Sequence, residues 1–227
     1  MAAACPICEQ RRGRRFCPGL AHSRWAGATE TICAPCCGEQ REVSIDCPTD
    51  CPYLTAAHRY EGERGAEKRR AGAAPAMPFP QVAIDQDFLE EKQHLIAGLS
   101  LFLVRYAGEH REVRDGELLA ALEALARSYQ TLDSGVYYEQ PPENPGARSL
   151  YAAAQSYLTQ FGQEQQQRVG TSLRPAEMLR ALVFLLRLGQ LEGNGRPLSR
   201  RYLGFLRAQL PADATSPREP RLIVPGS

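Results

Sequence analysis

Residues 175–190 read PAEMLRALVFLLRLGQ and form a helical pattern that is apolar over much of its circumference. Pro175 suits the first turn of a helix, where a missing N–H costs no intrahelical hydrogen bond. Gly189 and the Gly193–Gly195 turn close the pattern. Because a helix that is apolar on most sides is normally enclosed by others, these residues predict the central helix of a bundle.

Four further amphipathic patterns flank this helix along the chain. Asp85 or Asp87 provides an N-cap for the first, Asp115 for the second and Ser199 for a short last helix. The predicted helices begin and end near residues 85 and 108, 115 and 134, 145 and 168, 175 and 189, and 199 and 211. We therefore predict an all-α bundle of four to five helices over residues 85–210, and a disordered tail over residues 211–227.

All eight cysteines lie near the N-terminus, between Cys5 and Cys51. Residues 1–57 contain few aliphatic side chains, and a core this small is hard to stabilise by apolar burial alone. Clustered cysteines in a reducing compartment commonly bind metal. We predict a cysteine-rich zinc-binding module over residues 1–57, and the mixed charge and prolines that follow predict a linker over residues 58–84.

Two pairs of cysteines with the spacing C-x-x-C define a first candidate metal site. Thiolates with this spacing sit on one tight turn and reach the same ion, and zinc takes four such ligands in a tetrahedron. We therefore predict a zinc site from Cys5, Cys8, Cys33 and Cys36. An iron–sulfur cluster is the alternative that four thiolates would also support.

The remaining cysteines predict a second zinc site. Cys17, Cys47 and Cys51 supply three of its ligands. The fourth is Cys37 or His22. We favour Cys37, because thiolate is the stronger ligand and all eight cysteines are then used by two Zn²⁺ ions.

The version with His22 gives the ligand order Cys-Cys, Cys-His, Cys-Cys, Cys-Cys over residues 5–51. This order resembles RING-type zinc modules, in which alternate ligand pairs share one ion. The gaps from Cys17 to His22 and from Cys47 to Cys51 are longer than the usual RING steps. The resemblance therefore implies a cross-braced module, and we do not extend it to ubiquitin-ligase activity.

Enzyme motifs are lacking in the sequence. There is no phosphate-binding glycine loop, no nucleophile elbow and no convincing Ser-His-Asp set. Glu91 and His94 have the Glu-x-x-His spacing of di-iron bundles, but such bundles need a second copy. We therefore expect a non-enzymatic adaptor or regulatory protein that binds another protein. The alternative is nucleic-acid binding through the arginine-rich loop between Cys8 and Cys17, and an enzyme with a site in the bundle ranks below both.

The net charge of the chain bears on its expected partners, and its hydropathy bears on its expected location. The net charge is +1, so the chain as a whole is no obvious polyanion binder. The residues after Met1 lack the apolar core of a signal peptide, and no apolar run approaches the roughly 20 residues that span a bilayer. We expect a cytoplasmic protein without membrane insertion.

Overall fold

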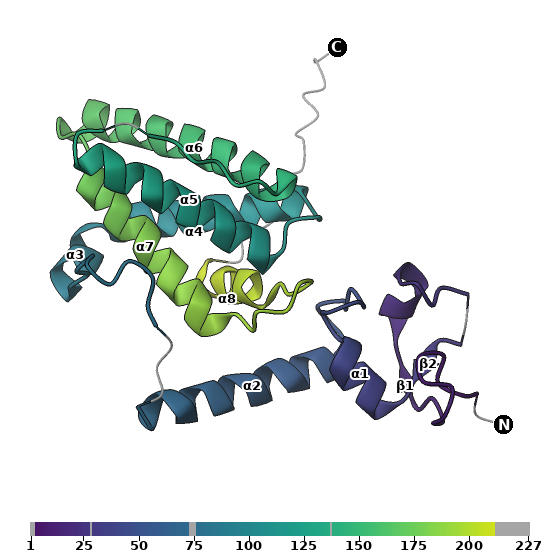
Figure 1. Cartoon of the computed structure of the whole chain (residues 1–227). Helices are drawn as coiled ribbons and strands as arrows, with labels where there is room; N and C mark the ends of the chain where they lie inside the picture. Colours follow the sequence, from purple (N-terminus) through teal and green to yellow (C-terminus); the bar gives the residue numbers. More distant parts are fainter. Residues whose placement is uncertain (1–2, 28, 73–75, 137, 212–227) are drawn as a thin grey trace, which may run out of the picture.

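The computed structural model describes residues 3–27, 29–72, 76–136 and 138–211. It contains a cysteine-rich module, a long helix and a helical bundle, which confirms the predicted fold class (Figure 1). The module contains β1 (Arg15–Phe16), the 3-10 helix η1 (Pro18–His22), β2 (Thr31–Ile32) and α1 (Ala34–Gln40). The long helix is α2 (Pro52–Arg70), and the bundle contains α3 (Gln86–Glu91), α4 (Gln93–Glu109), α5 (Asp115–Asp133), α6 (Pro145–Val169), α7 (Pro175–Glu192) and α8 (Arg201–Gln209). The predicted disordered tail, apart from Pro211, lies outside the described residues.

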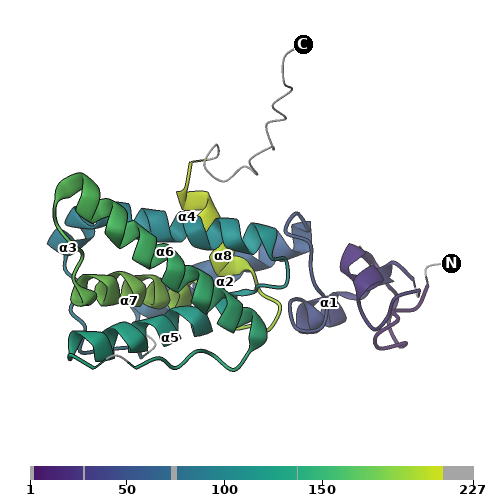
Figure 2. The same ribbon diagram turned by 90° about the horizontal axis from the view of Figure 1, so that it is seen from above.

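Helices α5 and α7 lie side by side (Figure 2), and they bury more residues than the other helices of the bundle. Helix α6 packs along α5, and α4 contacts both α6 and α8. A methyl group on Gly189 of α7 would lie 2.5 Å from Leu119 and 2.7 Å from the Tyr202 ring, so glycine permits the close approach of α7 to both neighbours. Residues 175–190 thus share the predicted central position with α5. None of the helices in the described part of the chain has the length and apolar character needed to cross a membrane.

The first predicted helix of the bundle is two helices, α3 and α4, which meet at Lys92. Asp85 caps α3 as predicted, because its carboxylate accepts a hydrogen bond from the Phe88 N–H at 2.9 Å. Lys92 has a ψ angle of 18° and ends α3. Its ammonium group lies 2.9 Å from the carboxylate of Glu177, in the first turn of α7. The ion pair therefore fixes the α3–α4 junction to α7. The apolar pattern of the sequence is continuous across residue 92 and does not reveal this break.

Asp115 has a different role from the predicted one. Arg114 is the N-cap of α5, and Asp115 is the first residue of the helix. The Asp115 side chain, buried with 5% of the residue exposed, instead accepts hydrogen bonds at the start of α8. Its donors are Ser199 Oγ at 2.9 Å, Tyr202 N at 2.9 Å and Leu203 N at 3.1 Å. Asp115 therefore caps α8 from another helix, since its oxygens satisfy backbone N–H groups that the first turn leaves free.

Helix α2 runs across the predicted module boundary at residue 57 and into the predicted linker. The structure describes all of this helix, and within it only Leu54 is buried. Pro52 at the first turn and the many Ala, Glu, Lys and Arg residues favour a helix without an apolar face. The end of the predicted linker contacts the bundle, since the Arg187 guanidinium donates to the carbonyl oxygens of Pro78, Phe79 and Val82.

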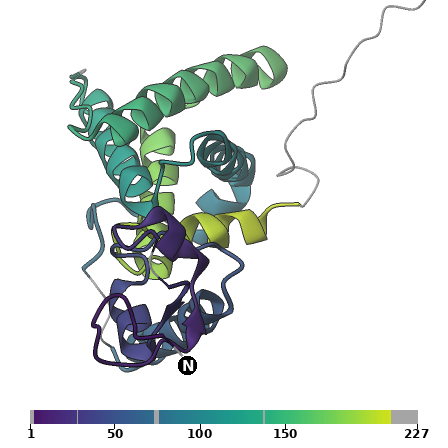
Figure 3. The same cartoon turned by 90° about the vertical axis from the view of Figure 1, so that its right-hand side faces the viewer.

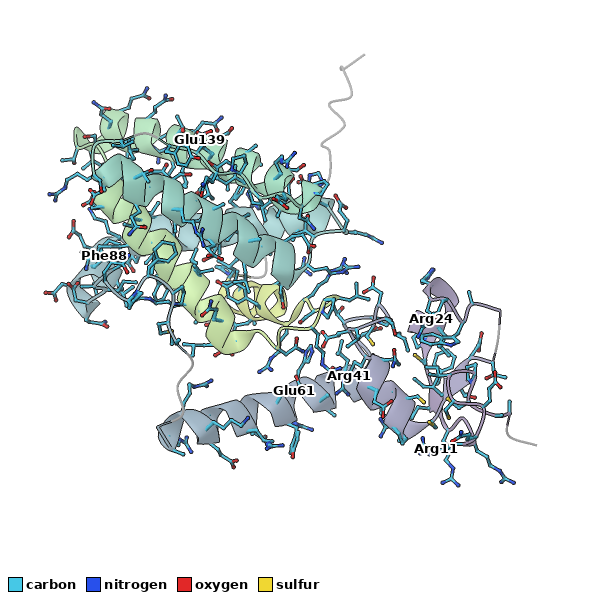
Figure 4. The ribbon with its side chains drawn as sticks, viewed as in Figure 1. Arg11, Arg24, Arg41, Glu61, Phe88 and Glu139 are labelled. Atoms are coloured by element: carbon cyan, nitrogen blue, oxygen red, sulfur yellow. The ribbon has the colours of Figure 1, made fainter. Side chains whose placement is uncertain are left out.

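Polar contacts join the module to α2 and to the bundle. Figure 3 shows the module and most of α6 on opposite sides of the molecule. Figure 4 shows Arg41 of the module and Glu61 of α2 at this junction, where their side chains lie 3.7 Å apart. Arg114 at the start of α5 donates to the Asp46 carboxylate at 2.6 Å. Arg196, in the loop after α7, donates to the Arg41 carbonyl oxygen at 2.6 Å. The module is therefore attached to the bundle mainly by charged and hydrogen-bonding groups.

Candidate metal centre

Local backbone pairing positions the first four cysteines. The bridge between Ala4 and Arg12 closes the loop that carries Cys5 and Cys8. Strand β1 pairs antiparallel with β2, which leads directly into Cys33, the N-cap of α1. A Cβ at Gly13 would lie 2.6 Å from the Thr31 carbonyl oxygen, so the two segments approach closely only because residue 13 is glycine. Cys36 follows in the first turn of α1 and completes the group.

The sulfur atoms of Cys5, Cys8, Cys33 and Cys36 all lie within 4.8 Å of one another. The sulfurs of Cys8 and Cys33 are 3.8 Å apart. A tetrahedron with metal–sulfur bonds of about 2.3 Å has sulfur–sulfur edges of roughly 3.8 Å. Cys5, Cys33 and Cys36 are buried, with at most 3% of each residue exposed. The four thiols therefore form a compact group that is compatible with a bound metal ion.

Backbone N–H groups point at the sulfurs of the first cysteine pair. The N–H groups of Gln10 and Arg11 donate to Cys8 and lower its pKa to about 6. Burial raises the pKa of Cys5, but the N–H groups of Cys33, Cys8 and Ile7 outweigh it, and the resulting pKa lies below the usual value. Hydrogen bonds from backbone amides favour the thiolate, which is the form that binds metal.

Cys36 shows the cost of gathering four thiols. Burial is the largest cause that raises its pKa, and hydrogen bonds with Cys33 and Cys8 raise it further. Four thiolates in a buried group repel one another unless a cation lies between them. The arrangement is thus electrostatically incomplete without positive charge.

Arg11 supplies part of this charge, a role that the sequence pattern did not assign to it. Its guanidinium donates a hydrogen bond to the sulfur of Cys33, and negative charge on Cys8 and Cys33 also raises the Arg11 pKa. Figure 4 shows Arg11 at the edge of the region where the sulfur atoms gather. The only signal in the sequence is that Arg11 lies close to Cys8. The same loop also carries Arg12, Arg14 and Arg15, so the sequence does not single out Arg11 as the one that contacts the cysteines.

The other four cysteines occupy neighbouring element ends. Cys17 is the N-cap of η1, and Cys51 is the N-cap of α2. Cys37 is buried on α1, and Cys47 lies in the following loop, partly buried against the same small core. A Cβ at Gly19 would lie 2.7 Å from the Asp46 carbonyl oxygen, so the turn after Cys17 packs directly beside Cys47.

These four thiols also influence one another. Burial raises the pKa of Cys47 to about 12, and negative charge on Cys17 and Cys51 contributes to the rise. Burial likewise raises the pKa of Cys17, with contributions from Cys37 and Cys51. The N–H groups of Leu20 and Gly19 donate to the Cys17 sulfur, in the arrangement found at Cys5 and Cys8. Among the described residues, however, the 4.8 Å clustering holds only for the first set.

None of the histidines in the described part of the chain belongs to the tight cluster of ligands. His22 is exposed at the end of η1, and its side chain makes no hydrogen bond within the described ranges of the chain. His58 on α2 lies 2.9 Å from the buried carboxylate of Glu42. In the bundle, His94 is exposed, and His110 stacks on Tyr106 with ring centres 4.1 Å apart. These positions do not form a histidine–carboxylate site of the di-iron kind.

Comparison of the chain with protein-family models, with curated proteins and with solved structures finds no match.

Proposed function

We propose that the cysteine-rich module binds zinc and that Cys5, Cys8, Cys33 and Cys36 hold the first ion. The observation that carries this proposal is the mutual approach of the four sulfurs within 4.8 Å. Zinc suits such a set because it accepts four thiolates without preference for another geometry. Two separate C-x-x-C turns also suit one tetrahedral ion better than an iron–sulfur cluster.

A second zinc ion belongs, in this proposal, to Cys17, Cys37, Cys47 and Cys51. Support comes from the packing of the Gly19 turn against Asp46, which brings Cys17 beside Cys47. Cys37 is buried next to this loop, whereas His22 is exposed. We therefore retain Cys37 as the fourth ligand and treat His22 as a surface residue.

The proposed role of these ions is structural. A closed set of four thiolates leaves no coordination position for a substrate. The ions would hold short elements that have little apolar core, and the module would present a surface for binding. We accordingly propose a non-enzymatic adaptor or regulatory protein of the cytoplasm, where a reducing environment keeps eight thiols available for metal.

The bundle supplies a second surface suited to a protein partner. An apolar groove of about 420 Å³ lies between α4, α7 and α8. Its apolar lining includes Leu89, Ile96, Phe184, Leu188, Phe205 and Leu210. Grooves of this character commonly accept an apolar face of another protein.

Elemental analysis of the purified full chain tests the metal proposal. We expect about two zinc ions per chain, about one after Cys5→Ser or Cys47→Ser, and about two after the control substitution His22→Ala. Iron with acid-labile sulfide, or no metal under reducing conditions, would overturn the zinc assignment. If Cys47→Ser keeps the full zinc content, the second site is wrong and the first one stands.

A further inference from the structure

An extended segment on the outer face of the module carries an alternating pattern of exposure. Arg12, Arg14 and Phe16 are exposed, whereas Gly13 is buried and Arg15 is half-buried. Alternate residues of an extended chain point to opposite sides. Arg15 points inward, and its guanidinium lies 4.5 Å from the centre of the Tyr53 ring. Arg12, Arg14 and Phe16 therefore lie on the same, outward side of the segment.

Three arginines on this surface have no carboxylate partner among the described residues, although Glu30 lines the neighbouring pocket. Residues 10–25 contain five arginines and no acidic residue. Arg12, Arg14 and Arg24 make no ion pair in the described ranges, whereas Arg41, Arg114 and Arg196 at the junction all do. The arginines at the junction thus have carboxylate partners inside the fold. Those on the outer face remain available to an anionic partner.

Aromatic side chains accompany these arginines. Phe16 is 58% exposed, so its ring is accessible to a partner. It lines a pocket of about 300 Å³ together with Leu20 and Trp25. The Arg24 guanidinium covers the Trp25 ring at 4.3 Å from its centre. The surface thus combines aromatic faces for stacking with cations beside them, in the region of Arg24 in Figure 4.

We propose that this surface, which we call the arginine–aromatic face (Arg12, Arg14, Phe16, Arg24 and Trp25), binds single-stranded nucleic acid. Arg12 and Arg14 would contact backbone phosphates, and one base would stack on Phe16 at the pocket beside Trp25. Alternation of cationic and aromatic side chains is the pattern that single-strand binding uses. The strands here have two residues each, too short for a ribbon that reads a duplex groove.

Nucleic-acid binding by this face rests on the proposed function, because the bound zinc ions would stabilise the fold of the module that carries it. Cys17 follows Phe16 directly and also lines the pocket. Loss of metal is therefore expected to abolish binding, so zinc content is measured for every variant below.

The test is fluorescence anisotropy of a labelled 12-nucleotide oligo-dT with the full zinc-loaded chain, read together with the emission of Trp25, the single tryptophan. The double variant Arg12→Glu/Arg14→Glu is expected to weaken binding at least tenfold, and Phe16→Ala about tenfold. Binding should weaken with salt, with a logarithmic slope of about −0.7 for each phosphate contacted. Trp25 emission should be quenched on binding.

Arg168→Glu/Arg207→Glu is the matched control, since both residues are exposed on the bundle and the charge change is the same. It is expected to bind like the unaltered chain. No binding by zinc-loaded protein at low salt, or equal loss in the control, would overturn the proposal and leave the metal assignment intact. If polyglutamate competes as well as the oligonucleotide, the partner is an acidic protein and the proposal is also overturned.

Discussion

The carboxylate of Glu42 accepts a hydrogen bond from the side-chain amide of Asn194 at 2.8 Å and thereby joins the cysteine-rich module to the loop after α7. Glu42 is 3% exposed, and its φ angle is 55°, a region that non-glycine residues seldom adopt. Its carbonyl oxygen also accepts from the Leu198 N–H at 2.8 Å. Backbone and side chain of one module residue thus both bind the bundle, and the strained conformation is maintained by these contacts.

Glu42→Ala should destabilise the protein by about 1–3 kcal/mol, because the partly buried amide of Asn194 loses its shorter hydrogen bond and the ring of His58 loses its partner. Glu39→Ala, which removes an exposed carboxylate from the same helix region, should change stability by less than about 0.5 kcal/mol. Urea unfolding of the zinc-loaded proteins measures both. Equal stability of the two variants would mean that the junction contributes nothing to folding.

Asp115→Ala should cost about 2–4 kcal/mol, because three buried donors at the start of α8 lose their acceptor together. Asp133→Ala, at the exposed last residue of α5, serves as the control and should be nearly neutral. Thermal unfolding followed by circular dichroism compares them. A loss smaller than about 1 kcal/mol for Asp115→Ala would show that α8 does not depend on this cap.

Replacement by alanine should change the stability of the protein in opposite directions at two helical glycines. Gly189→Ala places a methyl group against Leu119 and Tyr202 and should destabilise by about 1–3 kcal/mol. Gly204→Ala on the exposed side of α8 meets nothing within 4 Å and should stabilise by about 0.5–1 kcal/mol. Denaturant midpoints give both values. Stabilisation by Gly189→Ala would contradict the close approach of α7 to α5.

Glu177→Gln should lower stability at pH 7 by about 1 kcal/mol, with an effect that disappears in acid. Burial raises the pKa of Glu177, but the Arg174 N–H and Lys92 outweigh it, and the pKa lies below the usual value. The stabilisation is therefore complete above the unfolded pKa of about 4.3 and is lost as the pH falls through the lowered pKa. The stability difference from the unaltered chain, measured from pH 3 to pH 7, should follow this course. Glu109→Gln, which is exposed at the end of α4, should show no such dependence.

Sequence patterns predict the helices of the bundle well where periodicity reports burial. Residues 175–190 and 115–133 are apolar at helical spacing, and the structure buries those positions. The pattern also indicates the correct C-x-x-C turns, because their spacing is local. The residues brought together in Cys5, Cys8, Cys33 and Cys36 could therefore be named from the sequence.

Interactions between distant residues are not visible in such patterns. Asp115 has the sequence context of a cap for its own helix, yet it caps α8, which begins more than eighty residues later. Helix α2 lacks an apolar period and is stabilised by its composition and by Glu61, which pairs with Arg201. The contact of Arg11 with Cys33 depends on how two loops meet. Each case needs tertiary structure, because the partner is chosen by the fold and not by spacing.

Zinc K-edge X-ray absorption fine structure of the purified full chain tests the metal assignment most directly. We expect a first shell of four sulfur atoms at about 2.3 Å around each zinc ion, with no nitrogen shell. One nitrogen for every seven sulfurs would keep both ions but transfer the second site to His22. An iron edge in place of zinc, or a zinc shell of nitrogen and oxygen at about 2.0 Å, would contradict the assignment of the clustered thiolates as a zinc centre.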